Sequence, residues 1–115
     1  MKKRIKVVKF PKKIGHKYTP IELLPLELLH TKYSLHRRLK VFHHKGCVCV
    51  KCGIEGVHLV KAMSRSGAVH VDLYTADFKL MTIDHIIPKS KGGLNHISNL
   101  DPMCSRCNEK KGDKI

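Results

Sequence analysis

Two matched pairs of cysteines constrain the fold of this 115-residue chain more than any other feature. Cys49 and Cys52 form one Cys-x-x-Cys unit, and Cys104 and Cys107 form a second one near the end of the chain. Two sulfurs at this spacing can reach one ion from a single turn, and four thiolates complete the tetrahedral shell of zinc. The two units together predict a structural Zn²⁺ that ties the front of the domain to its last helix. Two unlinked free pairs, or a disulfide, are the alternatives.

A bound metal matters here because the apolar core is small. The chain has 42% hydrophobic residues, no Trp and 5% aromatic residues, a composition that suits one compact domain with a modest core. In such a chain the free energy of metal binding becomes free energy of folding. Cys47 is the odd cysteine. Because Cys49 already gives the usual two-residue gap to Cys52, we expect Cys47 to be a spare thiol.

The charge of the chain indicates a polyanionic partner. Lys and Arg number 23 against 9 Asp and Glu, which gives a formal net charge of +14. Self-repulsion at this density favours nucleic acid, DNA or RNA, as the partner, and a solvated basic surface without a partner is the alternative. No stretch is apolar enough to span a bilayer. An anionic membrane surface is a weaker rival to nucleic acid, and we expect no membrane partner. The basic start is unlike a secretory signal, and we expect a cytoplasmic location (the host cytoplasm if a phage encodes the chain), where paired cysteines usually bind metal.

The front of the chain is expected to form a basic arm over residues 1–17 and a helical extension over 18–46. The arm carries eight Lys or Arg and no acid, which suits a segment that follows a phosphate backbone. The Thr-Pro-x-Glu pattern at 19–22 is typical of a helix start. Apolar residues recur at mostly helical spacing over 26–42, and Gly46 suits the end of that helix.

Residues 47–115 are expected to form the main domain, and the whole chain to be of the α+β class. The first cysteine pair lies in a short loop. Two strands are predicted over 57–63 and 68–74, joined by a turn at 64–67, and a third over 79–84. In the second, Val69, Val71 and Leu73 alternate with His70 and Asp72, the pattern of a half-buried strand. A final helix is predicted over 101–111, with Gly112 as its stop.

Three side chains in this domain have the chemistry of phosphodiester hydrolysis. The reaction needs a base that takes a proton from water and a cation where negative charge develops. His85 is the natural base, because imidazole titrates near neutral pH. Asp84 and Asn108 offer hard oxygen ligands, which suit Mg²⁺ or Mn²⁺. Neighbours on a regular strand point to opposite faces, so Asp84 and His85 either flank a phosphate from different directions or lie where the strand bends.

The order of short motifs around these residues resembles the HNH endonuclease family. The chain has Asp-His-x-x-Pro at 84–88, Gly-Gly-x-Asn at 92–95, Asn-Leu at 99–100, Cys-x-x-Cys-Asn at 104–108 and Lys-Gly at 111–112. The resemblance covers residues 49–112 and implies a zinc-stapled ββα-metal (His-Me finger) core. The family usually has His as the third motif letter, whereas this chain has Asn108. An amide oxygen is a harder ligand than imidazole, which changes the expected preference for metals.

The resemblance implies a role for each of these residues. His85 is expected to activate water, Asp84 and Asn108 to bind the catalytic divalent ion, and Asn99 to order the loop that supports the histidine. A cap on the last helix is the alternative role for Asn99. The implied function is that of a metal-dependent endonuclease, a phosphodiester hydrolase that nicks or cuts DNA with Mg²⁺ or Mn²⁺ as the catalytic ion and Zn²⁺ as the structural ion.

Several basic side chains are candidates for contacts with nucleic acid. They are Lys2, Lys3, Arg4, Arg37, Arg38, Lys110 and Lys111. Such contacts hold phosphates without reading bases, so we expect steep salt dependence and little sequence preference. Small enzymes of this type are common in phages and mobile elements, which makes phage packaging proteins candidate partners. One active site per chain makes a monomer a nicking enzyme.

Two other functions fit part of the sequence. A zinc-stapled nucleic-acid-binding protein without catalysis needs the basic residues and the cysteines, but it has no need of Asp84, His85, Asn99 and Asn108 together. A ribosome-associated or RNA-associated zinc protein would use the same positive charge. Cleavage of a plasmid with added metal distinguishes the nuclease from both.

Overall fold

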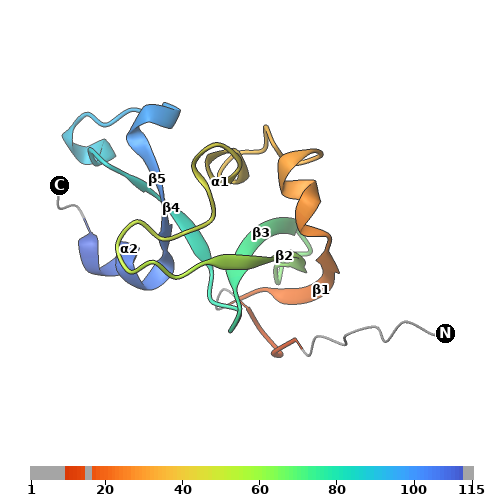
Figure 1. The fold of residues 1–115 in the computed structure, drawn as a ribbon. Helices are drawn as coiled ribbons and strands as arrows, with labels where there is room; N and C mark the ends of the chain where they lie inside the picture. Colours follow the sequence, from red (N-terminus) through yellow and green to blue (C-terminus); the bar gives the residue numbers. More distant parts are fainter. Residues whose placement is uncertain (1–9, 15–16, 113–115) are drawn as a thin grey trace.

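The computed structural model describes residues 10–14 and 17–112 (Figure 1). Most of the predicted basic arm, including Lys2, Lys3 and Arg4, lies outside the described residues. The described part contains two antiparallel sheets, several 3₁₀ turns and short α-helices, which confirms the α+β class. No helix in this part of the chain is long and apolar enough to cross a membrane.

A three-stranded sheet in the order β1-β2-β3 forms one side of the molecule (Figure 1). β2 (Gly56–Met63) and β3 (Val69–Thr75) pair antiparallel and confirm the first two predicted strands. The turn between them is closed by the N–H of Ser64, which donates to the carbonyl of Ala68 at 2.8 Å. Apolar alternation therefore predicted this hairpin correctly.

The helix start predicted at residues 19–22 is wrong, because β1 (Thr19–Leu24) is a strand. β1 pairs antiparallel with β2, with a bulge between Pro20 and Glu22. Pairing with β2 supplies the backbone hydrogen bonds that a helix would make locally. β1 lies at the edge of the sheet, where a proline without an N–H is tolerated.

The single helix predicted over residues 26–42 is also wrong. A short 3₁₀ helix, η1 (Leu26–His30), and an α-helix, α1 (Leu39–Lys45), are separated by turns. In the first turn the hydroxyl of Thr31 donates to a carbonyl of η1 at 3.2 Å, a local bond that competes with regular helix. Gly46 ends α1 as predicted, with a φ of 92°.

The second half of the chain forms a ββα unit, the layout that the family resemblance implies. β4 (Met81–His85) pairs antiparallel with β5 (Leu100–Cys104), and α2 (Ser105–Lys111) follows. β4 overlaps most of the third predicted strand, 79–84, and Gly112 ends α2 as predicted. The final helix begins later than the predicted residue 101, because the residues before Ser105 pair with β4 instead.

The loop from β4 to β5 contains two 3₁₀ turns, η2 (Lys89–Lys91) and η3 (Ile97–Asn99). α2 starts at the opposite end of the two-stranded sheet and runs back along β4. Its side chains contact Thr82 and Ile83 first and His85 in its last turn. The end of β4, the loop and the last turn of α2 therefore meet in one place.

One core joins these units. Its buried side chains are Leu29, Leu39, Phe42, Cys49, Leu59, Leu73, Met81, Met103 and Cys104. The predicted helical extension and the predicted main domain thus contribute to the same core. Because Cys49 and Cys104 belong to it, the cysteine pairs lie at the boundary of the apolar interior.

Candidate active site

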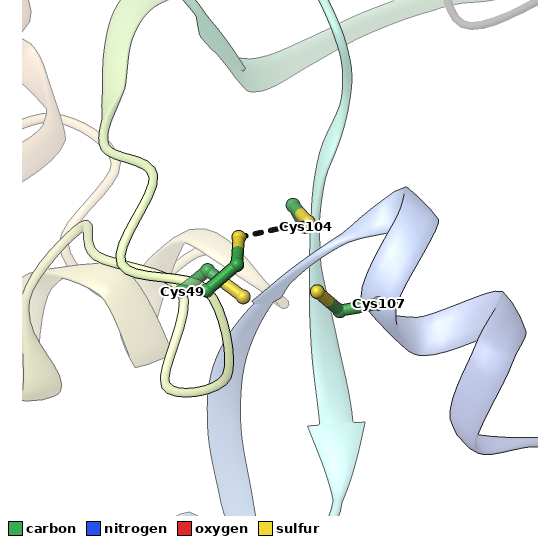
Figure 2. A group of neighbouring side chains, drawn as sticks. Cys49, Cys104 and Cys107 are labelled. Carbon is green, nitrogen blue, oxygen red and sulfur yellow. Dashed lines mark hydrogen bonds between the residues drawn. The ribbon is translucent and has the colours of Figure 1, made fainter.

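The four cysteines of the two matched units lie together. Their sulfur atoms are all within 4.8 Å of one another, and Figure 2 shows Cys49, Cys104 and Cys107 gathered in one place. Sγ of Cys52 is 3.7 Å from Sγ of Cys104. Sulfurs bound to a tetrahedral zinc at about 2.3 Å are separated by about 3.8 Å, so the spacing fits this ion. Cys47 lies outside the group.

The loop that carries Cys49 and Cys52 is shaped by its own backbone. The N–H of Gly53 donates to the carbonyl of Cys49 at 3.0 Å, and the positive φ of Gly53, 78°, turns the chain back. Burial opposes ionisation of Cys49, but the N–H groups of Cys104, Cys52 and Lys51 outweigh it and lower the pKa of Cys49 to about 6.

Ionisation of the second cysteine pair is opposed, because the pKa values of both Cys104 and Cys107 are raised. The side-chain hydrogen bond with Cys104 is the main cause that raises the pKa of Cys107 to about 12. The thiolate of Cys49 forms readily, whereas the thiolate of Cys107 is disfavoured. A divalent cation among the four sulfurs would stabilise all of the thiolates and so remove this difference. The donor set and its electrostatics both fit the predicted structural Zn²⁺.

The three residues predicted for the chemistry line one pocket. Asp84, His85 and Asn108 lie around a cavity of about 380 Å³ at the end of β4. Asp84 and His85 are consecutive, and both reach this cavity because β4 ends there. Lys89, which is exposed in η2, also lines the pocket and adds a positive charge.

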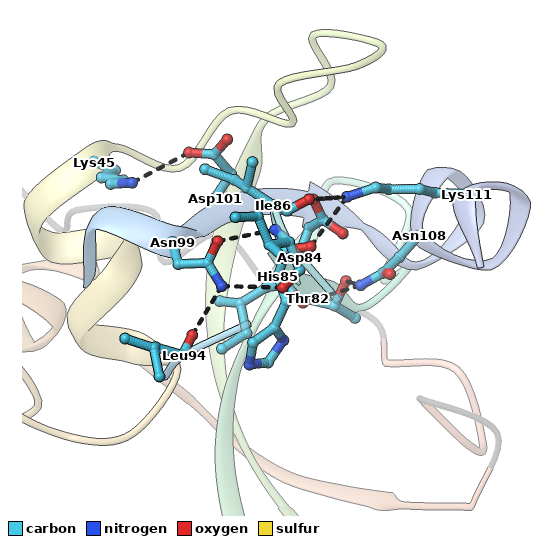
Figure 3. Close-up of polar contacts among 12 residues, drawn as sticks. Lys45, Thr82, Asp84, His85, Ile86, Leu94, Asn99, Asp101, Asn108 and Lys111 are labelled. Atoms are coloured by element: carbon cyan, nitrogen blue, oxygen red, sulfur yellow. Dashed lines mark hydrogen bonds and ion pairs between the residues drawn. The ribbon is translucent and has the colours of Figure 1, made fainter. Parts of the chain in front are cut away.

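Asn108 is held in one orientation by two bonds (Figure 3). Its Nδ2 donates to Oγ1 of Thr82 at 2.8 Å and to the carbonyl of Ile83 at 3.0 Å. The Thr82 hydroxyl in turn donates to the carbonyl of Met103 at 2.7 Å. Both N–H groups of the amide are used, so its carbonyl oxygen is the atom left to bind a cation.

His85 is oriented by a residue of the following loop. Its Nε2 lies 2.7 Å from Oδ1 of Asn95. An amide oxygen only accepts hydrogen bonds, so Nε2 is the donor, and the neutral imidazole keeps its lone pair on Nδ1. No hydrogen bond within the described part of the chain involves that Nδ1. The histidine is therefore arranged to accept a proton there.

Asn99 closes the loop between β4 and β5 (Figure 3). Its Oδ1 accepts from the N–H of Ile87 at 2.9 Å, and its Nδ2 donates to the carbonyls of Ile87 and Leu94 at 3.1 and 2.9 Å. The loop is tight enough that a Cβ on Gly93 would overlap the carbonyl oxygen of Ile87. The alternative role of Asn99 as a cap of the last helix is wrong, because Cys104 is the N-cap of α2.

The predicted nucleic-acid contacts have varied surroundings. Lys110 and Arg37 are exposed, and Nε of Arg38 lies 3.5 Å from Oδ1 of Asp72. Lys111 does not extend freely into solvent, because its Nζ donates to Oδ2 of Asp84 at 2.7 Å.

Sequence reasoning did not identify Thr82 and Asn95 as parts of the site, and it predicted Lys111 as a contact with nucleic acid, not as a partner of Asp84. The sequence contains a signal for each of the three residues. Thr82 lies two residues before Asp84 on one strand, and Lys111 lies three residues after Asn108 on one helix, so each pair shares a face. Asn95 is the last residue of the Gly-Gly-x-Asn motif.

Comparison with known proteins gives a family match over the segment that carries this pocket. The model of the HNH endonuclease family matches residues 74–115. The resemblance predicted from the motifs is thus confirmed over the segment that contains the ββα unit, and it indicates nuclease function in general. The cysteine cluster is compatible with a zinc-containing member. No curated protein and no solved structure matches the chain.

Proposed function

We propose that this protein is a metal-dependent endonuclease that hydrolyses phosphodiester bonds in DNA. The observation that carries the proposal is the convergence of Asp84, His85 and Asn108 on one pocket of the segment matched by the family. A base and two hard oxygen ligands beside one cavity are the minimum that this hydrolysis requires.

Each residue has a distinct part in the proposed reaction. Nδ1 of His85 takes the proton from the attacking water, while Asn95 holds the ring through Nε2. Asp84 and the amide oxygen of Asn108 would hold Mg²⁺ or Mn²⁺, and both are the oxygen donors that these ions prefer. When bound, the ion supplies positive charge where negative charge develops on the phosphoryl and leaving oxygens. Asn99 keeps the loop in place.

The chain's charge supports DNA as substrate, with RNA as the alternative. A net charge of +14 favours binding to phosphates in general. Exposed Lys110 and Arg37, together with the basic residues 2–4, are proposed to hold the backbone. Binding should therefore weaken steeply with salt and show little base preference.

The test is cleavage of supercoiled plasmid by the full chain, with Zn²⁺ bound, across a panel of divalent ions. We expect nicking with Mg²⁺ or Mn²⁺ that His85→Ala abolishes while zinc content and circular dichroism stay unchanged. His70→Ala is the matched control, because His70 is an exposed histidine of β3, in the other sheet, and does not line the pocket. DNA binding without cleavage under every ion would identify a zinc-stapled binding protein instead. Cleavage that persists in excess chelator with zinc retained would exclude the metal-dependent mechanism.

A further inference from the structure

The ammonium group of Lys111 is surrounded by oxygen atoms at the end of β4 (Figure 3). Its Nζ donates to Oδ2 of Asp84 at 2.7 Å, to the carbonyl of His85 at 3.1 Å and to that of Ile86 at 3.4 Å. The side chains of Lys111 and Asp84 are only 11% and 8% exposed. Carboxylate and carbonyl oxygens thus already enclose one cation, which the chain itself supplies.

The ion pair changes the charge that a divalent ion meets. Asp84 carries the one negative charge of the proposed ligand pair, and Lys111 balances it, while the Asn108 amide is neutral. An ion that shares the carboxylate with the ammonium is repelled by it, and this repulsion is strong away from bulk water. An ion that displaces the ammonium has to break a largely buried ion pair. By either route Lys111 weakens binding of the metal.

We propose that Lys111 is an internal competitor of the divalent ion at Asp84, and that nucleic acid relieves the competition. This inference rests on the proposed function, because it takes Asp84 as a ligand of the catalytic ion. A phosphate at the pocket offers the ammonium a second anion, and the flexible lysine stem at the last residue of α2 allows it to turn outward.

Cooperative binding follows from this exchange. A bound phosphate also supplies negative charge, which the divalent ion needs because Lys111 neutralises the carboxylate of Asp84. Metal and nucleic acid then each raise the affinity of the protein for the other by the same factor, as linkage requires. The protein would bind its catalytic ion weakly on its own and more tightly on its substrate.

The first experiment measures Mn²⁺ affinity without nucleic acid, by electron paramagnetic resonance of the zinc-loaded full chain. Lys111→Gln removes the charge but keeps an N–H donor for the carbonyls of His85 and Ile86. We expect it to bind Mn²⁺ about tenfold more tightly than wild type or better, and Lys111→Arg to stay near wild type. Lys110→Gln is the matched control: it removes the same charge from the neighbouring, exposed position and should change the affinity less than about twofold.

Equal or weaker binding of Mn²⁺ by Lys111→Gln overturns the inference, because it would mean that Lys111 supports the ligand Asp84 rather than competing for it. If Lys111→Gln does not fold, Lys111→Met provides the same comparison.

The second experiment keeps the native Lys111. The DNA affinity of His85→Ala is measured by fluorescence anisotropy at fixed ionic strength, with and without Mn²⁺. We expect Mn²⁺ to tighten DNA binding about tenfold, and no tightening would contradict the coupling.

The two proposals fail separately. A chain that cleaves plasmid but shows no gain of Mn²⁺ affinity in Lys111→Gln retains the proposed function and loses the inference. A chain that gains Mn²⁺ affinity in this variant but never cleaves retains the competition at Asp84 and loses the nuclease assignment.

Discussion

The loop that supports His85 depends on the side chain of Asn99, and the Asn99→Ala variant tests this dependence. The amide makes three hydrogen bonds, at 2.9, 3.1 and 2.9 Å, to backbone groups of Ile87 and Leu94. A hydrogen bond of this kind contributes about 1 kcal/mol net, which sets an upper value of about 3 kcal/mol. Ile87 and Leu94 are exposed, so water replaces part of the loss, and we expect Asn99→Ala to destabilise the protein by about 2 kcal/mol.

The expected loss is large enough to measure. For a domain of this size, about 2 kcal/mol corresponds to a fall in Tm of roughly 8 °C. The assay is thermal unfolding followed by circular dichroism with zinc in excess, because partial loss of metal would make unfolding depart from a two-state transition. Asn95→Ala is the matched control, since this exposed asparagine in the same loop makes one side-chain bond, to His85.

Asn95→Ala should change the Tm by less than about 2 °C, because a single exposed bond contributes little. A Tm of Asn99→Ala within the same range would refute the reasoning. The loop would then be held by its backbone bonds, such as that from the N–H of Gly93 to the carbonyl of Pro88 at 2.9 Å, and not by the asparagine.

Three further predictions concern the metal sites and the base. Cys104→Ser should lose zinc and unfold, whereas Cys47→Ala should keep one zinc per chain by metal analysis; loss of zinc from Cys47→Ala would contradict the ligand set. Asn95→Ala should slow plasmid cleavage about tenfold or more while Mn²⁺ affinity stays constant, and an unchanged rate would show that His85 needs no orienting partner. Thr82→Val should weaken Mn²⁺ binding several-fold, because Asn108 loses one of the acceptors that orient its amide, and calorimetric titration that gives wild-type affinity would exclude this role.

Much of the candidate site could be predicted because its chemistry lies in short segments. The two Cys-x-x-Cys units, the Asp-His pair at 84–85 and Asn108 are recognisable by residue type and spacing alone. The hairpin of β2 and β3 follows from apolar alternation, and Gly46 and Gly112 mark helix ends correctly. Each of these features depends on residues that are neighbours along the chain.

Two of the errors occurred where a distant partner decides the structure. Residues 19–24 have the local signals of a helix start, but β2 is available to pair with them, and the ladder outweighs a weak helical preference. The final helix predicted over 101–111 includes residues 101–104, yet these residues pair with β4. Local propensities differ by a few tenths of a kcal/mol per residue, so pairing with a strand far along the chain readily overrides them.

Sequence by itself therefore determined which side chains are candidate donors for metal ions and which imidazole is the candidate base, because these are properties of single side chains in short motifs. Tertiary structure decided how these side chains are oriented and which residues contact them. The antiparallel pairing of β4 with β5 and the return of α2 along β4 bring Thr82 against Asn108, Asn95 against His85 and Lys111 against Asp84. Hydrogen bonds and ion pairs act over a few ångströms, and only the folded chain brings residues 10 to 27 positions apart within that range.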